Sequence, residues 1–247
     1  AADGYGRMLL ELKSVSKRFG AVVAAEGIDL AVAQGEALGI IGANGAGKSS
    51  LFNLITGVLS PDAGTVSFQG QEITRSSVRD RCRSGIGRSF QIPQPFETLT
   101  VFENLMVAAE FGSGDSEMGL EETFAILEMT ELADKANIVS GKLTLLDRKR
   151  LELARALATN PDLLLLDEIA GGLTEGECLR LVELIGSLHK RGITIIWIEH
   201  IVHALLSVVS RLIVLERGVL IAQGEPKAVM ADPAVRRSYL GIEEAAS

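Results

Sequence analysis

Gly42 to Ser49 (GANGAGKS) place three glycines, one lysine and one hydroxyl side chain in the spacing G-x-x-x-x-G-K-[ST]. Glycine lets backbone N–H groups approach a phosphate chain where a Cβ would obstruct them. Lys48 would reach the β- and γ-phosphates, and the Ser49 hydroxyl would bind Mg²⁺. The pattern predicts a triphosphate site with these binding residues: Gly42, Ala43, Asn44, Gly45, Ala46, Gly47, Lys48, Ser49 and Ser50.

The segments on either side of this loop have the character that it requires. Glu36 to Ile41 predict a buried strand, and residues 49–56 predict a helix that stops near Gly57. Strand, loop and helix in this order direct the N-terminus of the helix at the phosphates. A glycine-rich turn without a ligand is the alternative, but it would have no use for Lys-Ser at the helix start.

Two carboxylates follow a second apolar segment. Leu163 to Leu166 are four leucines between polar residues, which is typical of a central parallel strand buried on both faces. Ligands bind at the carboxyl edge of such strands, where Asp167 and Glu168 stand. We expect Asp167 to hold Mg²⁺ through water and Glu168 to polarise the attacking water. Two acids that merely begin a loop are the alternative, which the upstream phosphate loop disfavours.

Three further residues are candidates on position alone. Phe19 stands at a predicted strand end and could stack on an adenine ring, although a core or hairpin phenylalanine is the alternative. Gln91 could touch Mg²⁺ or the attacking water, but a lone glutamine is more often a polar loop residue. His200 follows a buried strand and could bind the γ-phosphate, although a lone histidine more often caps its own chain.

Alternation, apolar runs and turn residues predict the other elements. Thr100 with Glu103, and Thr174 with Glu177, predict capping boxes at the starts of two helices. The predicted strands are 10–19, 27–32, 65–69, 86–91, 193–198, 211–216 and 219–222, and the predicted helices are 78–84, 100–111, 121–136, 143–157, 175–190 and a final pair ending near 241.

Composition restricts the class of protein. The chain has 247 residues, of which 47% are hydrophobic, so it can bury a large core. Its formal net charge of -8 argues against an extended nucleic-acid surface, and its two cysteines, Cys82 and Cys178, predict no metal cluster. No run reaches the roughly 18 apolar residues that span a bilayer, so we expect a soluble or peripheral protein. Residues 1–7 precede Met8 and are expected to be an expression remnant.

Phe19, Gly42–Ser49, Gln91, the 143–157 helix, Leu163–Glu168 and His200, taken in this order, resemble the ATP-binding subunit of ABC transporters over essentially the whole chain. The resemblance implies ATP and Mg²⁺ as cofactors. It makes Phe19 the adenine-stacking aromatic, Glu168 the catalytic base and His200 the switch histidine. Gln91 would be the Q-loop glutamine, which contacts Mg²⁺.

The implied fold class is α/β: a P-loop NTPase of ABC type, with a RecA-like sheet core, an antiparallel N-terminal β part and a helical subdomain. We expect one ABC ATPase domain over 8–247. Its α/β core would comprise 8–91 and 144–247, and the helical insert about 92–143.

One segment departs from the family pattern. The signature loop usually reads Leu-Ser-Gly-Gly-Gln, whereas residues 143–147 here are Leu-Thr-Leu-Leu-Asp. Thr144 retains a hydroxyl, which the resemblance places at the nucleotide of the opposite protomer. Asp147 could cap the helix, but would repel phosphate if it pointed inward. Ile169 replaces the usual proline after Asp-Glu, and Thr174 the usual aspartate of the D-loop.

Residues 146–155 (LDRKRLELAR) and the tail containing Gly224-Glu225-Pro226 and Tyr239-Leu240-Gly241 resemble the ATPases of branched-chain amino acid uptake systems. The implied function is ATP hydrolysis that drives solute uptake. The implied partners are two integral-membrane permease subunits, a second ATPase subunit or a second copy of this chain, and indirectly a periplasmic solute-binding protein, with no nucleic acid. The implied location is the cytoplasmic face of the inner membrane, as a peripheral subunit.

Two other functions remain open from the sequence. A soluble ABC-type assembly or regulatory ATPase, such as the partner of an iron–sulfur scaffold, would have the same motifs without a role in transport. A pseudo-ATPase that only binds nucleotide would explain the altered signature, but Glu168 and His200 are both present. A DNA-repair ATPase fits less well, because the chain is acidic and has no coiled-coil insertion.

Overall fold

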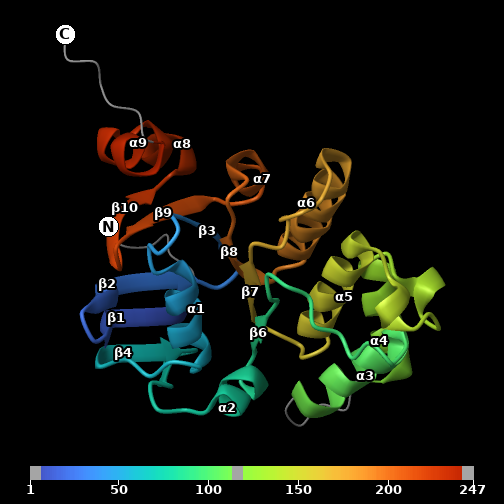
Figure 1. Ribbon diagram of the computed structural model, residues 1–247. Helices are drawn as coiled ribbons and strands as arrows, with labels where there is room; N and C mark the ends of the chain where they lie inside the picture. The colour runs from blue at the N-terminus through green and yellow to red at the C-terminus, as the bar shows by residue number, and fades with distance from the viewer. Residues whose placement is uncertain (1–6, 113–118, 241–247) are drawn as a thin grey trace. The chain divides into compact units, whose positions relative to one another are not determined.

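The computed structural model describes residues 7–112 and 119–240. The chain divides into two compact units, shown in Figure 1. Unit 1 consists of Ala1–Ser77 and Ile196–Ser247, and unit 2 of Val78–Ile195. The boundary falls inside strand β8 (Thr194–Ile198), all five residues of which are buried.

Unit 1 contains an antiparallel sheet with the strand order β2-β1-β4-β5. Strand β1 (Met8–Phe19) lies between β2 (Val22–Ala33) and β4 (Ala63–Phe68), and β5 (Gln71–Glu72) follows at the edge. Within β1, Leu10 pairs with Phe68 and Leu12 with Val66, and all four side chains are buried. Because side chains alternate across a strand, this register directs one apolar face of the sheet inward.

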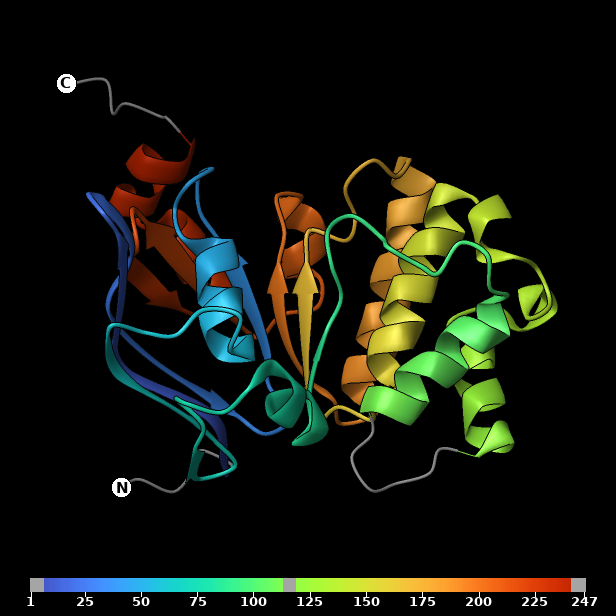
Figure 2. The ribbon, with the colours of Figure 1, turned by 60° about the horizontal axis from the view of Figure 1, so that its bottom comes forward.

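Three further strands of unit 1 carry the phosphate loop. Strand β3 (Ala37–Ile41) runs parallel to β9 (Arg211–Glu216), which forms an antiparallel hairpin with β10 (Val219–Gly224). All five residues of β3 are buried, as expected for a strand covered on both faces. The helices of unit 1 are α1 (Lys48–Thr56), α7 (Val202–Leu206), α8 (Pro226–Ala231) and α9 (Pro233–Leu240), and Figure 2 gives a second view of this unit.

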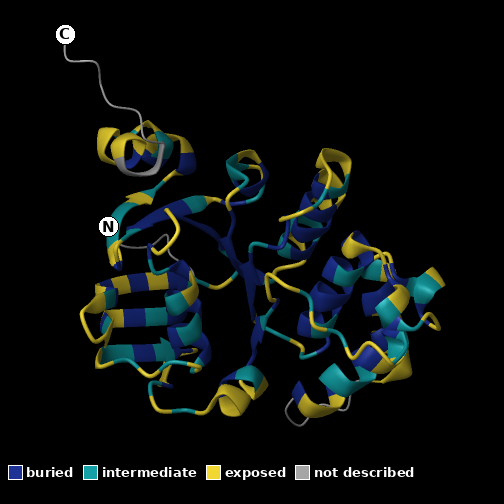
Figure 3. Ribbon diagram, in the orientation of Figure 1, coloured by how far each residue is buried: buried dark blue, intermediate teal, exposed yellow. Residues whose placement is uncertain are grey.

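Unit 2 joins a pair of parallel strands to a group of helices. Strand β6 (Ile86–Arg88) pairs with β7 (Leu163–Asp167), so that Arg88 lies opposite Leu165. The buried residues of β7 and of α5 form dark bands in Figure 3. The helices of this unit are α2 (Val78–Arg83), α3 (Val101–Gly112), α4 (Leu120–Met129), α5 (Leu145–Leu157) and α6 (Glu175–Lys190), with 3₁₀ turns at Ala133–Lys135 and Ser140–Lys142.

Both predicted capping boxes are confirmed. The Thr100 hydroxyl accepts a hydrogen bond from Glu103 N, while the Glu103 carboxylate accepts from Thr100 N. Thr174 and Glu177 exchange the same two bonds at the start of α6. These bonds satisfy N–H groups that the first helical turn leaves without an internal partner.

Several predicted boundaries are wrong. Strand β6 ends at Arg88 and not at Gln91, because the chain leaves the sheet for a loop in which Pro93 and Pro95 have no N–H to donate. The helix predicted over 121–136 ends at Met129, because Glu131 adopts a left-handed backbone (φ 56°) that no α-helix continues. Helix α7 was not predicted.

None of the helices in the described parts of the chain has both the length and the apolar character needed to cross a membrane.

Candidate functional site

The phosphate loop connects β3 to α1, and its glycines are required by the surrounding backbone. A Cβ at Gly42 would lie 2.4 Å from the carbonyl oxygen of Leu215. A Cβ at Gly47, whose φ is +103°, would lie 2.4 Å from the carbonyl oxygen of Ala24. Gly218 N donates to Ala46 O at 2.8 Å, which fastens the loop to the β9–β10 turn. Packing on two sides therefore fixes the curve of the loop, and a side chain at either glycine would displace it.

The interior of this loop is suited to phosphate. The Lys48 side chain is buried, and its Nζ donates to Gly42 O at 2.7 Å and to Ala43 O at 3.1 Å. Gly47 is the N-cap of α1 and offers no side-chain acceptor to the first N–H groups of the helix. A helix start that its own side chains do not cap, together with an ammonium folded into the loop, forms a cradle for an anion. The exposed Ser49 lies beside it.

Unit 2 supplies the two acids at the end of β7. The Asp167 side chain is almost fully buried, and its Oδ2 accepts a hydrogen bond from Arg88 Nη2 at 2.8 Å. Glu168 follows in a left-handed backbone conformation (φ 47°). Its Oε2 accepts a hydrogen bond from Gln91 Nε2 at 2.7 Å. The segments that leave β6 and β7 are thus paired twice, at Arg88–Asp167 and at Gln91–Glu168.

The left-handed conformation of Glu168 is unusual for a residue with a side chain. It costs about 1–2 kcal/mol relative to an ordinary backbone conformation, and such strain is concentrated at functional sites. The structure places the Glu168 carboxylate on the amide of Gln91, and this hydrogen bond orients both side chains. This arrangement can hold a water molecule for in-line attack on a phosphate, because a carboxylate accepts protons and an amide donates and accepts hydrogen bonds.

Arg88 was missed by reasoning from the sequence. Its partner Asp167 is 79 residues away, and only the register of β6 against β7 brings the two together. The guanidinium also lies over the ring of Phe90, 4.9 Å from its centroid. Arg83 lies just before this strand and Arg88 at its end, and nothing in the local sequence distinguishes the one that pairs.

Phe19 and His200 belong to unit 1. Phe19 is the last residue of β1, and about half of its surface is exposed (48%), which leaves a ring face for stacking. Lys17 Nζ lies 5.6 Å from the ring centroid. His200 is exposed directly after β8, and its backbone N donates to the buried carboxylate of Glu199 at 2.9 Å. The backbone of this exposed histidine is thus held by the preceding carboxylate.

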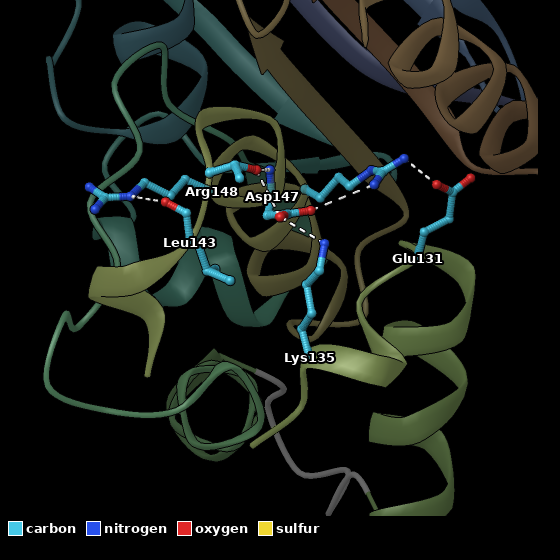
Figure 4. Close-up of polar contacts among 7 residues, drawn as sticks. Glu131, Lys135, Leu143, Asp147 and Arg148 are labelled. Carbon is cyan, nitrogen blue, oxygen red and sulfur yellow. Dashed lines mark hydrogen bonds and ion pairs between the residues drawn. The ribbon is translucent and has the colours of Figure 1, made fainter. Parts of the chain in front are cut away.

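The altered signature segment begins helix α5. Thr144 is the N-cap and accepts a hydrogen bond from Asp147 N, so the expectation that Asp147 caps the helix is wrong. The Asp147 carboxylate accepts hydrogen bonds at Oδ2 from Lys135 Nζ and from the Thr144 hydroxyl, both at 2.8 Å (Figure 4). Its Oδ1 lies 3.7 Å from Arg150 Nη1. The hydroxyl proton of Thr144 therefore points to Asp147.

Electrostatics accounts for the buried position of Asp147. Burial alone would raise its pKa. The hydrogen bonds from Lys135 and Thr144 and the charges of Lys135 and Arg150 outweigh burial, so the pKa of Asp147 lies below its ordinary value. Arg150 is shared with Glu131, which forms a second ion pair with it. Figure 4 shows the carboxylate turned into this cluster of helix α5 and the neighbouring turns.

The described residues contain no cluster of three or more metal-ligating side chains. Magnesium at nucleotide sites typically keeps several waters and takes one or two protein ligands besides the phosphates. Ser49 in unit 1, and Asp167 and Gln91 in unit 2, carry the oxygen donors that such an ion prefers. Each unit therefore carries oxygen donors of the kind that suits Mg²⁺ bound together with a nucleotide.

Comparison with known proteins gives consistent matches. A family model described as "ABC transporter" matches residues 25–171, and one described as "Branched-chain amino acid ATP-binding cassette transporter" matches residues 219–245. The chain is 34% identical to a probable branched-chain amino acid transport ATP-binding protein LivG of Methanocaldococcus jannaschii, covering 94% of this chain and 97% of that protein. It is 33% identical to the high-affinity branched-chain amino acid transport ATP-binding protein BraF of Pseudomonas aeruginosa, covering 95% of this chain and 98% of that protein.

Solved structures give the same match in three dimensions. A crystal structure of an ATP-binding cassette of an ABC transporter in its ADP conformation superposes with a TM-score of 0.86 at 34% identity, covering 95% of this chain and 99% of that one. A nucleotide-free ATP-binding cassette superposes with a TM-score of 0.85 at 33% identity, covering 96% and 100%. A dimeric bacterial cassette has a TM-score of 0.79 at 26% identity, covering 88% and 99%.

Proposed function

Because the chain belongs to the ATP-binding cassettes of ABC transporters, we propose that it is the ATP-hydrolysing subunit of an importer for branched-chain or related amino acids. As a member of this family the chain is an ATPase. The observation that carries the site assignment is the cradle formed by the glycines of the loop, the buried Lys48 and the uncapped start of α1. The relatives whose names include branched-chain amino acid transport support amino acids as the substrate class.

The loop residues Gly42–Ser50 bind the phosphates, with Lys48 as the cation nearest the β- and γ-groups. Phe19 stacks on the adenine, since about half of the residue's surface is exposed and an aromatic face attracts a base. His200, which follows the carboxyl end of β8, donates to the γ-phosphate. Magnesium, held by Ser49 and Gln91 directly and by Asp167 through water, would neutralise phosphate charge.

Glu168 is the general base for hydrolysis. Its carboxylate takes a proton from the attacking water as the water oxygen bonds to the γ-phosphorus, and the bond to the β–γ bridging oxygen breaks to leave ADP and phosphate. Gln91 holds the carboxylate in position through its 2.7 Å hydrogen bond. General-base catalysis of this kind contributes about 10²–10⁴-fold in rate.

Subunits of this family act with membrane permeases, and a related cassette is dimeric. Here two integral-membrane permease subunits and a second ATPase subunit, or a second copy of this chain, complete the transporter. The periplasmic solute-binding protein is an indirect partner, and the chain sits as a peripheral subunit on the cytoplasmic face of the inner membrane. Thr144 approaches the nucleotide of the opposite ATPase. Exposed Phe90, Ile92 and Phe96 in unit 2 support permease docking on the loop after β6, because apolar clusters exposed on a surface mark protein contacts.

The test is a pull-down from gently solubilised membranes of the native host, with a tag on this chain. We expect two multi-span permeases and a second small ATPase, and the genes of these partners would identify the solute. The tagged chain with Ile92 changed to serine is the comparison variant, and it should retain less of the permeases because Ile92 is the most exposed of the three side chains. A soluble partner without any membrane protein would overturn the transport function in favour of an assembly ATPase.

A further inference from the structure

Three charged residues follow one face of helix α5 at helical spacing: Lys149, Glu152 and Arg155. The first two are nearly fully buried, at 4% and 5% exposure, and the Arg155 side chain is mostly covered. Buried charges are expensive unless each is paired and hydrogen-bonded. Their partners therefore explain why the helix carries them.

All three residues bind the backbone of one loop, residues 90–94. The Glu152 carboxylate is paired with Arg155 at 3.2 Å, and the backbone N–H groups of Phe90 and Gln94 are turned toward it so that they lower its pKa. Lys149 Nζ donates to the carbonyl oxygen of Gln91 at 2.8 Å. Arg155 Nη1 donates to the carbonyl oxygen of Gln94 at 2.8 Å. Glu152 on α5 thus faces the N–H groups of the loop, while Lys149 and Arg155 on either side of it donate to carbonyl oxygens of the loop.

The loop needs these external partners. Pro93 and Pro95 lack N–H groups, so the segment cannot close a regular hydrogen-bonded turn of its own. Two cation–aromatic contacts add to the attachment: Arg155 lies 5.2 Å from the ring centroid of Phe96, and Arg88 lies 4.9 Å from that of Phe90. Arg155 Nη1 also pairs with Glu152 Oε2 at 3.2 Å, which compensates the buried carboxylate.

Gln91 lies between the two N–H groups that Glu152 holds. Its backbone is fixed by Glu152 and Lys149, while its side chain donates to Glu168. We propose that Glu152 is a positioning residue for ATP hydrolysis, which fixes the 90–94 backbone so that the Gln91 amide stays on the Glu168 carboxylate. The inference rests on the roles of Gln91 and Glu168 given under Proposed function. Glu152 itself touches neither nucleotide nor water in this scheme.

The choice of a carboxylate has a physical reason. Burial raises the pKa of Glu152 above its ordinary value, and the charge of Arg155 and the N–H groups of Gln94 and Phe90 offset only part of this rise. A glutamine of the same shape offers one acceptor oxygen and an NH₂ group that would meet a donor. Alanine offers neither. The loop should therefore loosen in steps, from wild type through Glu152→Gln to Glu152→Ala.

The direct test is hydrogen–deuterium exchange of the full chain without nucleotide, with peptides that cover residues 86–96. We expect faster exchange of the Phe90 and Gln94 amides in Glu152→Ala, by at least about tenfold, because their acceptor is lost. Glu152→Gln should raise the exchange of fewer amides than Glu152→Ala does. Glu183→Gln, at an exposed position of helix α6, should exchange at the wild-type rate. Exchange that rises equally across unit 2 would indicate general destabilisation and overturn the proposal.

The second test is ATP turnover of the full chain, isolated with the subunits that accompany it. Glu152→Ala should lower kcat about 10–100-fold with KM changed less than about twofold, because a misplaced catalytic group affects the reaction and not ground-state binding. Glu152→Gln should lose less, about 3–10-fold. In a Gln91→Ala background, Glu152→Ala should add less than about twofold, since residues that act as one unit are not additive.

The outcomes distinguish the role of Gln91 in hydrolysis from the positioning role of Glu152. Normal turnover in Gln91→Ala would overturn the role of Gln91 under Proposed function, and the positioning role with it. Loss of turnover in Gln91→Ala with normal turnover in Glu152→Ala would overturn the positioning role alone. Full additivity of the two changes would also overturn it, because Glu152 would then act independently of Gln91.

Discussion

Gln91 Nε2 lies 2.7 Å from Glu168 Oε2, although the two residues are 77 positions apart in the chain. The contact exists because β6 and β7 run parallel and their carboxyl ends lie at the same edge of the sheet, Arg88 opposite Leu165 and β7 two residues longer. Glu168 also departs from ordinary backbone geometry, with a φ of 47°. Strand pairing, backbone conformation and a side-chain hydrogen bond thus converge on one carboxylate.

Glu168→Gln should bind ATP and hydrolyse it at background rate. The change removes the proton acceptor but keeps the shape of the side chain, so we expect a loss of about 10²–10⁴-fold in kcat. Phosphate release in single-turnover assays measures this, and ATP affinity by titration calorimetry is the companion measurement. Glu183→Gln is the matched control. Turnover at the wild-type rate would remove Glu168 from the role of base.

Lys48→Ala should weaken ATP binding. The buried ammonium would lose its contacts to phosphate, and charge-assisted hydrogen bonds of this kind contribute roughly 1.5–3 kcal/mol, or about 10–100-fold in Kd. Titration calorimetry with ATP measures the change. Lys190→Ala, at an exposed position near the end of α6, should bind like wild type. An unchanged Kd in Lys48→Ala would show that the nucleotide binds elsewhere.

Arg88→Met should destabilise the fold more than it weakens nucleotide binding. Removing one partner leaves the Asp167 carboxylate buried and uncompensated, which typically lowers the free energy of unfolding by about 3–5 kcal/mol. Urea denaturation followed by circular dichroism measures this change. Arg79→Met, at an exposed position of α2, is the control for loss of a surface arginine. If both variants unfold at the same urea concentration, the Arg88–Asp167 pair does not stabilise the protein.

Asp147→Asn should lower the free energy of unfolding at neutral pH, by roughly 1–3 kcal/mol, because the carboxylate binds Lys135 and Thr144. The pKa of Asp147 is depressed in the folded protein, so the stabilisation is complete above the unfolded value. It is lost as pH falls from the ordinary aspartate range through the lower folded pKa. Denaturation midpoints of both proteins, measured from pH 7 down to pH 3, should therefore converge in acid. A constant difference across this range would exclude the ionic origin.

Much of the candidate site could be predicted from local sequence. The loop 42–49 was predictable because its glycines, lysine and serine are contiguous, and the acids because four leucines mark a buried strand just before them. Gln91 and His200 became specific only through the order of motifs along the chain. The residues that support the site could not be found in this way: Arg88 depends on strand register, and Glu152 on how α5 packs against a loop about 60 residues away.

The errors have the same origin. Ser89 to Gln91 have the composition of a strand, but tertiary contacts draw them into the loop. Asp147 is a good helix cap by type, yet Thr144 precedes it by three residues and takes the cap, which leaves the carboxylate free to bind Lys135. Which of two suitable residues caps a helix therefore depends on the side chains around each of them, here Lys135 beside Asp147.

Gly47 gives helix α1 a beginning without a side-chain acceptor. In most helices such an acceptor belongs to the chain itself, and its contribution to stability, about 1 kcal/mol, is permanent. Here the acceptor arrives with the nucleotide, so that contribution varies with nucleotide concentration and affinity. The melting temperature of the chain should therefore rise with the concentration of ATP or ADP in the solution.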